Sequence, residues 1–162
     1  MLGIATHDGL PAIVRSTALD LVVQIPSVQV GHATIALLDD PSPLVRASAL
    51  PGLHGLTPAE RVPHLSRLLA DPTRTVRMAA ARETLSMPTV VLDAQSRGKA
   101  EKATEDWHDS LQAKADYPEI HLVMGGFALT QRQLHGALAA FREATDLDHQ
   151  LVQAWTMQAR IH

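Results

Sequence analysis

The chain of 162 residues contains no cysteine, and this absence removes several classes of chemistry. Without thiols it can form no disulfide, offer no thiolate nucleophile, and hold no zinc, iron–sulfur cluster or covalently attached haem through sulfur. Aromatic residues are scarce as well, with two Trp, two Phe and one Tyr. Apolar residues make up 46% and charged residues 19% of the sequence. These proportions and this length indicate an ordinary globular chain that forms one domain or one continuous repeat array.

The sequence also lacks an excess of basic residues and any long apolar run. Fourteen Lys and Arg stand against seventeen Asp and Glu, for a net charge of -3. Binding to the phosphate backbone of nucleic acids requires a basic surface, which this balance does not supply. No apolar run reaches the roughly 18 residues of a membrane helix, and residues 1–10 do not resemble a signal peptide. We therefore expect no nucleic-acid partner and no membrane insertion.

A repeat of 31 residues runs through the first half of the chain. The pattern Val-Arg-x-x-Ala recurs from Val14, Val45 and Val76, and Asp-Pro precedes it by five residues at Asp40 and Asp71. A Leu-Leu pair lies just before each Asp-Pro. Asp suits a helix N-cap and Pro suits the first turn, so each corner is predicted to end one helix and begin the next. Two amphipathic helices per unit bury their apolar faces only by stacking on neighbouring units.

This pattern resembles HEAT-type repeats, in particular their short variety. The resemblance implies stacked antiparallel helices over residues 1–88. It further implies a ladder of contacts between neighbouring units, formed here by Asp40, Asp71, Arg46 and Arg77. We expect these four residues to be structural and not catalytic.

A different pattern follows residue 88. Ala100, Ala103, Trp107 and Leu111 recur at spacings of three and four, which predicts a helix over 97–116 with Trp107 in the core. From Pro118 the chain resembles a tetratricopeptide repeat of 34 residues. The residues that match the signature of this family are Gly125, Ala137, Phe141 and Ala144, and Trp155 lies 34 residues after His121. Small residues in this signature let two helices approach closely.

The two resemblances together predict an all-α fold, a right-handed solenoid of stacked helical hairpins. HEAT-like repeats occupy residues 1–88, a connector 89–96, and tetratricopeptide-like repeats 97–162. In the latter family the first helices of each unit line a concave groove that binds partners. The residues that the resemblance places in this groove are Glu119, Leu122, Gly126, Leu129, Gln153, Thr156 and Arg160.

One tetratricopeptide class binds the C-terminal carboxylate of its partner through Lys, Arg and Asn of these helices. Leu122 and Gly126 occupy the corresponding positions and donate no side-chain hydrogen bond, which leaves Arg160 alone. The carboxylate clamp is therefore absent. An apolar strip suits a partner helix or the next section of the same solenoid.

The repeat pattern is incomplete at both ends. The first 31-residue unit has room only for its second helix, and the last 34-residue unit stops after its first. An uncapped solenoid end leaves an apolar face in water. We therefore expect a section of a longer solenoid, or self-association through an end.

Nine histidines are the main candidates for chemistry, but their spacing does not favour a site. No two lie four residues apart, and no His-Glu-x-x-His stretch is present. His54 could meet His64 across a hairpin, as could His121 and His135, and a small hydrolase using His and Asp is a further alternative. No Gly-x-Ser-x-Gly elbow and no phosphate-binding loop occur. We expect no catalysis, no metal and no cofactor, and a protein–protein interaction scaffold that is cytoplasmic by default.

The order of the parts provides one more resemblance. IVRSTAL, DDPSPLVRASAL and ADPTRTVRMAAAR, followed by ADYPEIHLVMGGFAL, are similar to the C-terminal part of bacterial multihaem cytochrome c-type proteins with tetratricopeptide repeats. The haem-binding motifs of those proteins lie upstream, and this chain has none. The resemblance implies an alternative function, an accessory domain of an electron-transfer protein, and with it a periplasmic location.

Overall fold

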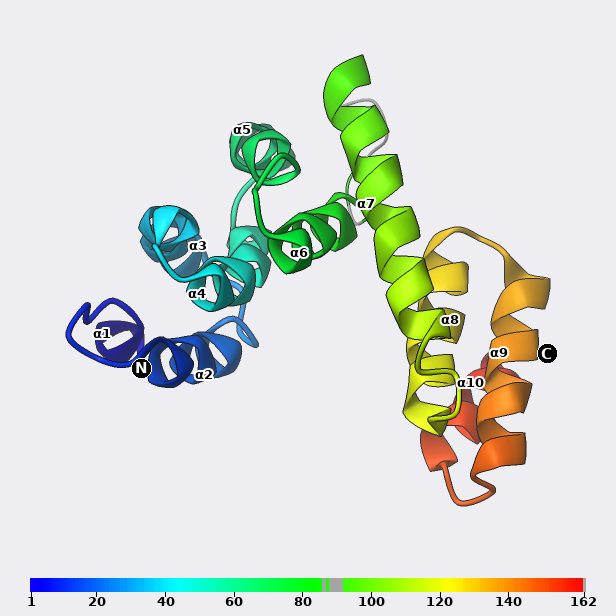
Figure 1. Cartoon of the computed structure of the whole chain (residues 1–162). Coiled ribbons are helices and arrows are strands. Elements are labelled where there is room, and N and C mark those ends of the chain that lie inside the picture. Colours follow the sequence, from blue (N-terminus) through cyan, green and yellow to red (C-terminus); the bar gives the residue numbers. More distant parts are fainter. Residues whose placement is uncertain (86, 88–91, 162) are drawn as a thin grey trace. The chain divides into compact units, whose positions relative to one another are not determined.

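The computed structural model describes residues 1–85, 87 and 92–161, and over these residues the chain is helical, with ten α-helices, two short 3-10 helices and no β-strand (Figure 1). The expected all-α class is therefore confirmed. Residues 89–91 of the expected connector lie outside the described residues. The chain divides into two compact units, Met1–Thr104 and Glu105–His162.

The first unit is a succession of short helices joined by tight corners. In chain order they are α1 (Leu2–Ala5), α2 (Ala12–Val22), α3 (Val28–Ile35), η1 (Ala36–Asp39), α4 (Pro43–Ala49), η2 (Leu50–Gly55), α5 (Pro58–Leu68) and α6 (Arg74–Leu85). Helix α2 packs on α4, α4 packs on α6, and α3 packs on η2. Helices that carry the Val-Arg-x-x-Ala pattern are thus neighbours in space.

The core of this unit is aliphatic. Its largest fully buried aliphatic side chains are Leu19, Leu38, Val45, Leu50, Leu53, Leu65, Leu68, Leu69 and Val76, and α3 adds the fully buried Thr34. The Leu-Leu pairs of the sequence lie at helix ends, in η1 and at the end of α5, and all four side chains are buried. Burial of such residues is the main stabilising term for helices too short to be stable alone.

The corners occur where the repeat predicts them, but the predicted role of their Asp was wrong. Ser42 is the N-cap of α4, and Pro43 is its first residue. Asp40 lies two residues before the cap, and its Oδ1 accepts a hydrogen bond of 2.8 Å from the Ser42 N–H. Asp71 accepts an equivalent bond of 2.8 Å from Thr73. Each Asp therefore forms an Asx turn before the helix, which leaves its second carboxylate oxygen available to other partners.

Helix α5 begins with a capping box that the sequence analysis did not identify. The Thr57 hydroxyl accepts a bond from the Glu60 N–H, and the Glu60 carboxylate accepts one of 2.8 Å from the Thr57 N–H. Pro58 follows in the first turn. Two backbone donors that would otherwise lack partners are thus satisfied, which fixes the start of the helix.

The second unit contains the end of α7 and three further helices. Helix α7 spans Ala94–Gln112, and it is followed by α8 (Pro118–Thr130), α9 (Leu134–Leu147) and α10 (Val152–Ile161). The helix predicted over 97–116 is therefore confirmed, with both of its ends shifted toward the N-terminus. Trp107 is buried as expected, and its ring meets that of Phe127 edge to face at 4.9 Å. No helix in the described part of the chain has the length and apolar content to cross a membrane.

Close packing of α8 on α9 depends on Gly125. A Cβ atom at this position would stand 2.5 Å from Cε1 of Phe141, a side chain only 1% exposed. Glycine therefore allows the Phe141 ring to lie against the α8 backbone. Ala128 and Ala137 join Phe141 in the core of the unit, with Leu122, Leu129, Met157 and Ile161 packed around it.

Candidate functional site

A hollow of about 340 Å³ opens beside α8, α9 and α10 in the second unit. We call it the α8–α10 groove. Its lining residues are Leu122 and Gly126 of α8, Phe141 of α9, and Val152, Gln153, Thr156 and Met157 of α10. Gly126 contributes to the open space because its missing side chain leaves no atom within 4 Å of the Cβ position.

Helix α10 is held in place by a partly buried amide contact. The Gln158 amide donates to the Phe141 carbonyl at 3.0 Å and to the Thr145 hydroxyl at 3.1 Å. Thr145 is itself buried, and its hydroxyl donates to the Arg142 carbonyl. These bonds fix the side of α10 that faces α9 and leave Gln153 and Thr156 on the groove.

The structure brings four of the seven sequence-predicted site residues together in the groove. Leu122, Gly126, Gln153 and Thr156 line it. Leu129 packs instead against the core cluster. Glu119 and Arg160 are exposed and are not part of the lining. Val152 and Met157, which adjoin predicted residues on α10, were not predicted, and Phe141 was identified only as a residue of the repeat signature.

The chemistry of the groove is apolar. None of the seven lining residues carries a charge. The Thr156 hydroxyl donates to the Val152 carbonyl at 2.9 Å and can still accept a hydrogen bond, so the Gln153 amide is the remaining side-chain donor among the seven lining residues. Such a lining suits an apolar side chain accompanied by one hydrogen bond. None of the lining residues in the described part of the chain is a cation, so they offer no ion pair to a carboxylate.

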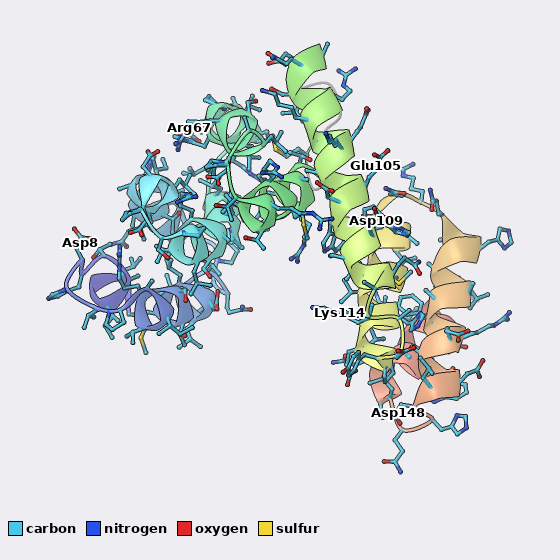
Figure 2. The ribbon with its side chains drawn as sticks, viewed as in Figure 1. Asp8, Arg67, Glu105, Asp109, Lys114 and Asp148 are labelled. Atoms are coloured by element: carbon cyan, nitrogen blue, oxygen red, sulfur yellow. The ribbon has the colours of Figure 1, made fainter. Side chains whose placement is uncertain are left out.

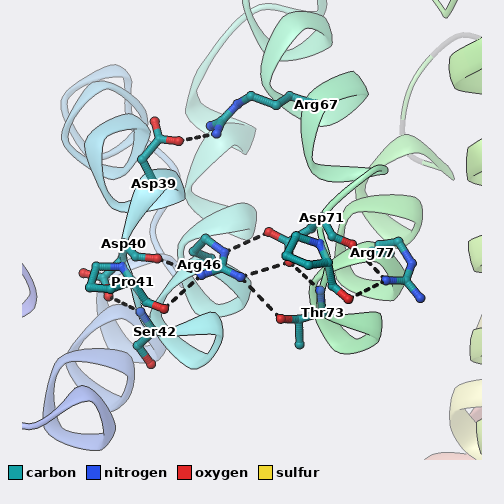
Figure 3. A network of polar contacts seen from close by, with 10 residues as sticks. Asp39, Asp40, Pro41, Ser42, Arg46, Arg67, Asp71, Thr73 and Arg77 are labelled. Carbon is teal, nitrogen blue, oxygen red and sulfur yellow. Dashed lines mark hydrogen bonds and ion pairs between the residues drawn. The ribbon is translucent and has the colours of Figure 1, made fainter.

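Of the predicted contacts between Arg and Asp of neighbouring corners, the first unit contains that of Arg46 with Asp71 (Figure 3). Arg46 binds the Asp71 carboxylate and also donates to the Asp40 carbonyl at 2.8 Å. Arg77, one repeat length after Arg46, makes the matching bond and donates to the Asp71 carbonyl at 2.8 Å. Arg15, which the sequence analysis did not include, lies 2.6 Å from the Asp40 carboxylate. Arg15 is the Arg of the first Val-Arg pair, so the 31-residue repeat was sufficient to predict its contact with Asp40.

These contacts change the acidity of Asp71. Burial acts to raise the pKa of this carboxyl, but hydrogen bonds from Arg46 and Thr73 outweigh it and lower the pKa below the ordinary value. The carboxylate is therefore charged and fully engaged. Because all of its partners lie within the unit, the network stabilises the fold and offers no open site.

A buried carboxylate that sequence analysis did not single out lies on α6. Oε2 of Glu83 is 2.7 Å from Nε2 of His54 and 3.6 Å from Nη2 of Arg61. Burial raises the pKa of Glu83, and the nearby positive charges of His54, Arg61 and Arg82 lower it in part. The cluster connects η2, α5 and α6. It explains the position of His54 without a metal or a catalytic role.

Two other histidines bond to backbone carbonyls. His121 Nε2 lies 2.7 Å from the Ala115 oxygen, and His149 Nδ1 lies 2.6 Å from the Thr145 oxygen. Among the described residues, no three His, Asp or Glu side chains come together as metal ligands. Of the charged side chains labelled in Figure 2, Asp8, Arg67, Glu105, Asp109 and Lys114 are exposed, and Asp148 is partly buried.

The α8–α10 groove is thus an open apolar surface, whereas the contacts of Asp71 and Glu83 are directed into the first unit. The groove is a candidate site for contact with another molecule. No protein-family model, curated protein or solved structure matches the chain.

Proposed function

We propose that this chain is a non-catalytic scaffold that binds a protein partner through the α8–α10 groove. The observation that carries this proposal is the uncharged lining of the groove, which combines apolar side chains with a single available amide. A surface of this kind provides contact area and orientation but no acid, base or nucleophile.

We further propose that the scaffold is an α-solenoid of HEAT-like and tetratricopeptide-like helix pairs. The 31-residue spacing of Val45 and Val76, both fully buried, supports this arrangement, as does the packing of α2, α4 and α6 in succession. The Arg–Asp contacts between successive corners are the bonds that such a repeat would use in every unit.

The partner proposed for the groove is a peptide segment that inserts an apolar side chain. The volume of about 340 Å³ accommodates one large side chain, and Phe141 forms an apolar wall. Amphipathic helices present such side chains from one face, at spacings of three and four residues. The Gln153 amide can hydrogen bond to a polar group beside the inserted residue.

Peptides selected from a random display library against the whole chain test the proposal. Gly126→Leu is the informative variant, because a Cβ atom at this position meets no atom within 4 Å and the longer side chain then occupies the groove. We expect the selected peptides to bind this variant at least about 10-fold more weakly, a change of about 1.4 kcal/mol.

Gly98→Leu is the matched control. Gly98 also has no atom within 4 Å of its Cβ position, but it lies on α7, outside the groove. The affinity of the Gly98→Leu variant for the peptides should equal that of the native chain. C-terminal amidation of the peptides should leave their affinity unchanged, because the described lining residues include no cation. Equal binding to both glycine variants would contradict the proposal.

A further inference from the structure

Two charges of opposite sign flank the uncharged lining of the α8–α10 groove. Among Asp, Glu, Lys and Arg, helix α8 contains only Glu119, and helix α10 contains only Arg160. Both side chains are exposed. Neither forms a salt bridge with another residue in the described part of the chain. Both charges are therefore available to a molecule that lies in the groove.

The two charges lie on the helix faces that form the groove. Glu119 precedes the lining residues Leu122 and Gly126 by three and seven residues, and side chains at these spacings share one face of a helix. On α10, Arg160 follows the lining residues Gln153 and Thr156 by seven and four residues. Each charge therefore continues a lining face beyond the hollow.

The charges belong to opposite ends of the groove. The short loops 131–133 and 148–151 join α8 to α9 and α9 to α10, and the joined helices pack on each other. Helices connected in this way are antiparallel neighbours, so α8 and α10 run in the same direction. Glu119 lies in the first turn of α8, and Arg160 lies in the last turn of α10. The groove thus has an acidic end and a basic end.

Phe141 fixes the distance between these ends. Its ring lies against Gly125 of α8, and its carbonyl accepts a hydrogen bond from the Gln158 amide of α10, so Gly125 and Gln158 lie at one level. Glu119 comes six residues before Gly125, and Arg160 comes two residues after Gln158. At about 1.5 Å per residue, Glu119 and Arg160 are about 12 Å apart along the groove.

We propose that the partner held in the groove is a helical segment with an acidic residue seven or eight residues before a basic one and an apolar residue between them. This inference rests on the proposed function, because it specifies the peptide that the groove binds. Seven or eight residues of helix span about 10–12 Å, so the acidic side chain meets Arg160 while the basic one meets Glu119. Two helical turns separate these charges, which places them on the same face as the apolar residue.

Helix dipoles set the direction of the bound segment. A helix has a partial positive charge at its N-terminal end and a partial negative charge at its C-terminal end, so antiparallel neighbours attract each other. An acidic residue near the N-terminal end of the segment and a basic residue near its C-terminal end complement its own dipole as well. The segment therefore lies antiparallel to α8 and α10, with its N-terminal end at Arg160. Its C-terminal carboxylate then lies away from Arg160, in agreement with the absence of a carboxylate clamp.

The sequences of the peptides selected from the display library against the whole chain provide the first test. Among peptides whose binding Gly126→Leu weakens, an acidic residue seven or eight residues before a basic one should be at least about 5-fold more frequent than in the unselected library. Enrichment of the reverse order, or of neither order, would overturn the inference and leave the proposed function intact. A selection that yields no peptide sensitive to Gly126→Leu would contradict the proposed function and this inference together.

Exchange of the two charges provides the second test. Each selected peptide is compared with a second peptide in which its acidic and basic residues have changed places, so that composition and net charge stay the same. The native chain should bind the original peptide at least about 5-fold more tightly at low salt, which corresponds to two exposed ion pairs. The double variant Glu119→Lys with Arg160→Glu should prefer the exchanged peptide by a similar factor. Salt at about 0.5 M should reduce both preferences, because it screens exposed charges.

Two further double variants complete the test. Glu119→Gln with Arg160→Gln removes both charges at nearly constant side-chain size, and it should bind the two peptides equally. Asp109→Lys with Lys114→Glu is the matched control, because both residues are exposed and neither lines the groove (Figure 2). This control should keep the native preference. An unchanged preference in the neutral variant or in the charge-exchanged variant would overturn the inference, while sensitivity to Gly126→Leu would still support the proposed function.

Discussion

Arg46 binds both carboxylate oxygens of Asp71, with Nε 2.8 Å from Oδ2 and Nη2 2.9 Å from Oδ1. The two residues belong to successive corners of the first unit. Both side chains are largely buried, so the pair is shielded from water and its geometry is bidentate.

Arg46→Ala should therefore destabilise the first unit strongly. The substitution leaves the Asp71 carboxylate buried without its principal partner, and we expect the free energy of unfolding to fall by about 3 kcal/mol. Urea denaturation followed by circular dichroism measures this change. Arg67→Ala is the comparison, because Arg67 pairs with Asp39 at the surface. That loss should stay below about 1 kcal/mol. Similar losses for the two variants would refute the distinction between the pairs.

The lowered pKa of Asp71 predicts a dependence on acid. A carboxyl whose folded-state pKa lies below its ordinary value of 3.8 contributes fully to stability above that pH, and the contribution disappears as the pH falls through the folded-state pKa. The native chain should thus lose stability below about pH 4 more steeply than Asp71→Asn. Melting temperatures of both proteins, measured from neutral pH to pH 2, show how steeply the stability of each falls with pH. Parallel curves for the two proteins would show that Asp71 has no lowered pKa.

Adjacent glycines on α8 should respond in opposite directions to alanine. Gly125→Ala places a Cβ atom 2.5 Å from the buried Phe141 ring, so the helices must separate. Overpacking of this kind costs about 1–3 kcal/mol of stability. Gly126→Ala meets no atom within 4 Å and should stabilise the helix by about 0.5–1 kcal/mol. Thermal or urea unfolding of both variants measures these changes in stability. A loss of stability in Gly126→Ala would be inconsistent with the open surroundings of this position.

The capping box of α5 predicts a pKa change that can be read at one residue. Hydrogen bonds from the Thr57 hydroxyl, 2.7 Å away, and from the Thr57 backbone N–H hold the pKa of Glu60 below its ordinary value of 4.5. Thr57→Ala removes the first of these and should raise the Glu60 pKa toward 4.5. An NMR titration of the side-chain carboxyl measures it. Thr75→Ala, at an exposed threonine of α6, should leave the Glu60 pKa as it is.

The sequence allowed the helices of the first unit to be predicted because periodic burial and repeated corners reinforce each other. Val45 and Val76 are buried as the 31-residue spacing requires. The role of Asp40 was predicted wrongly because an Asp carboxylate can cap a helix or form an Asx turn, and the choice depends on where the helix begins. Here Pro43 begins the helix and Ser42 is its cap, which moves Asp40 outside it.

Part of the groove lining was also predictable from a repeat spacing. Leu122, Gly126, Gln153 and Thr156 follow from the register of two helices in a 34-residue pattern. Which neighbours complete the lining depends on the rotation of α10 against α9, and this is set by the bonds of Gln158, which no sequence spacing reveals. The contact of His54 with Glu83 was also not predictable from the sequence spacing. It joins residues that stand at no shared repeat position, so only the folded arrangement brings them together.

The span of the Arg46–Asp71 contact has a consequence for how quickly the first unit forms. Its two ends are 25 residues apart, and Arg15 and Asp40 close a segment of the same length. The entropic cost of closing such a segment grows only slowly with its length, and helical proteins whose contacts join neighbouring helices reach the native state quickly. We therefore expect residues 1–85 to fold rapidly in small cooperative steps, each corner closing onto the one already formed.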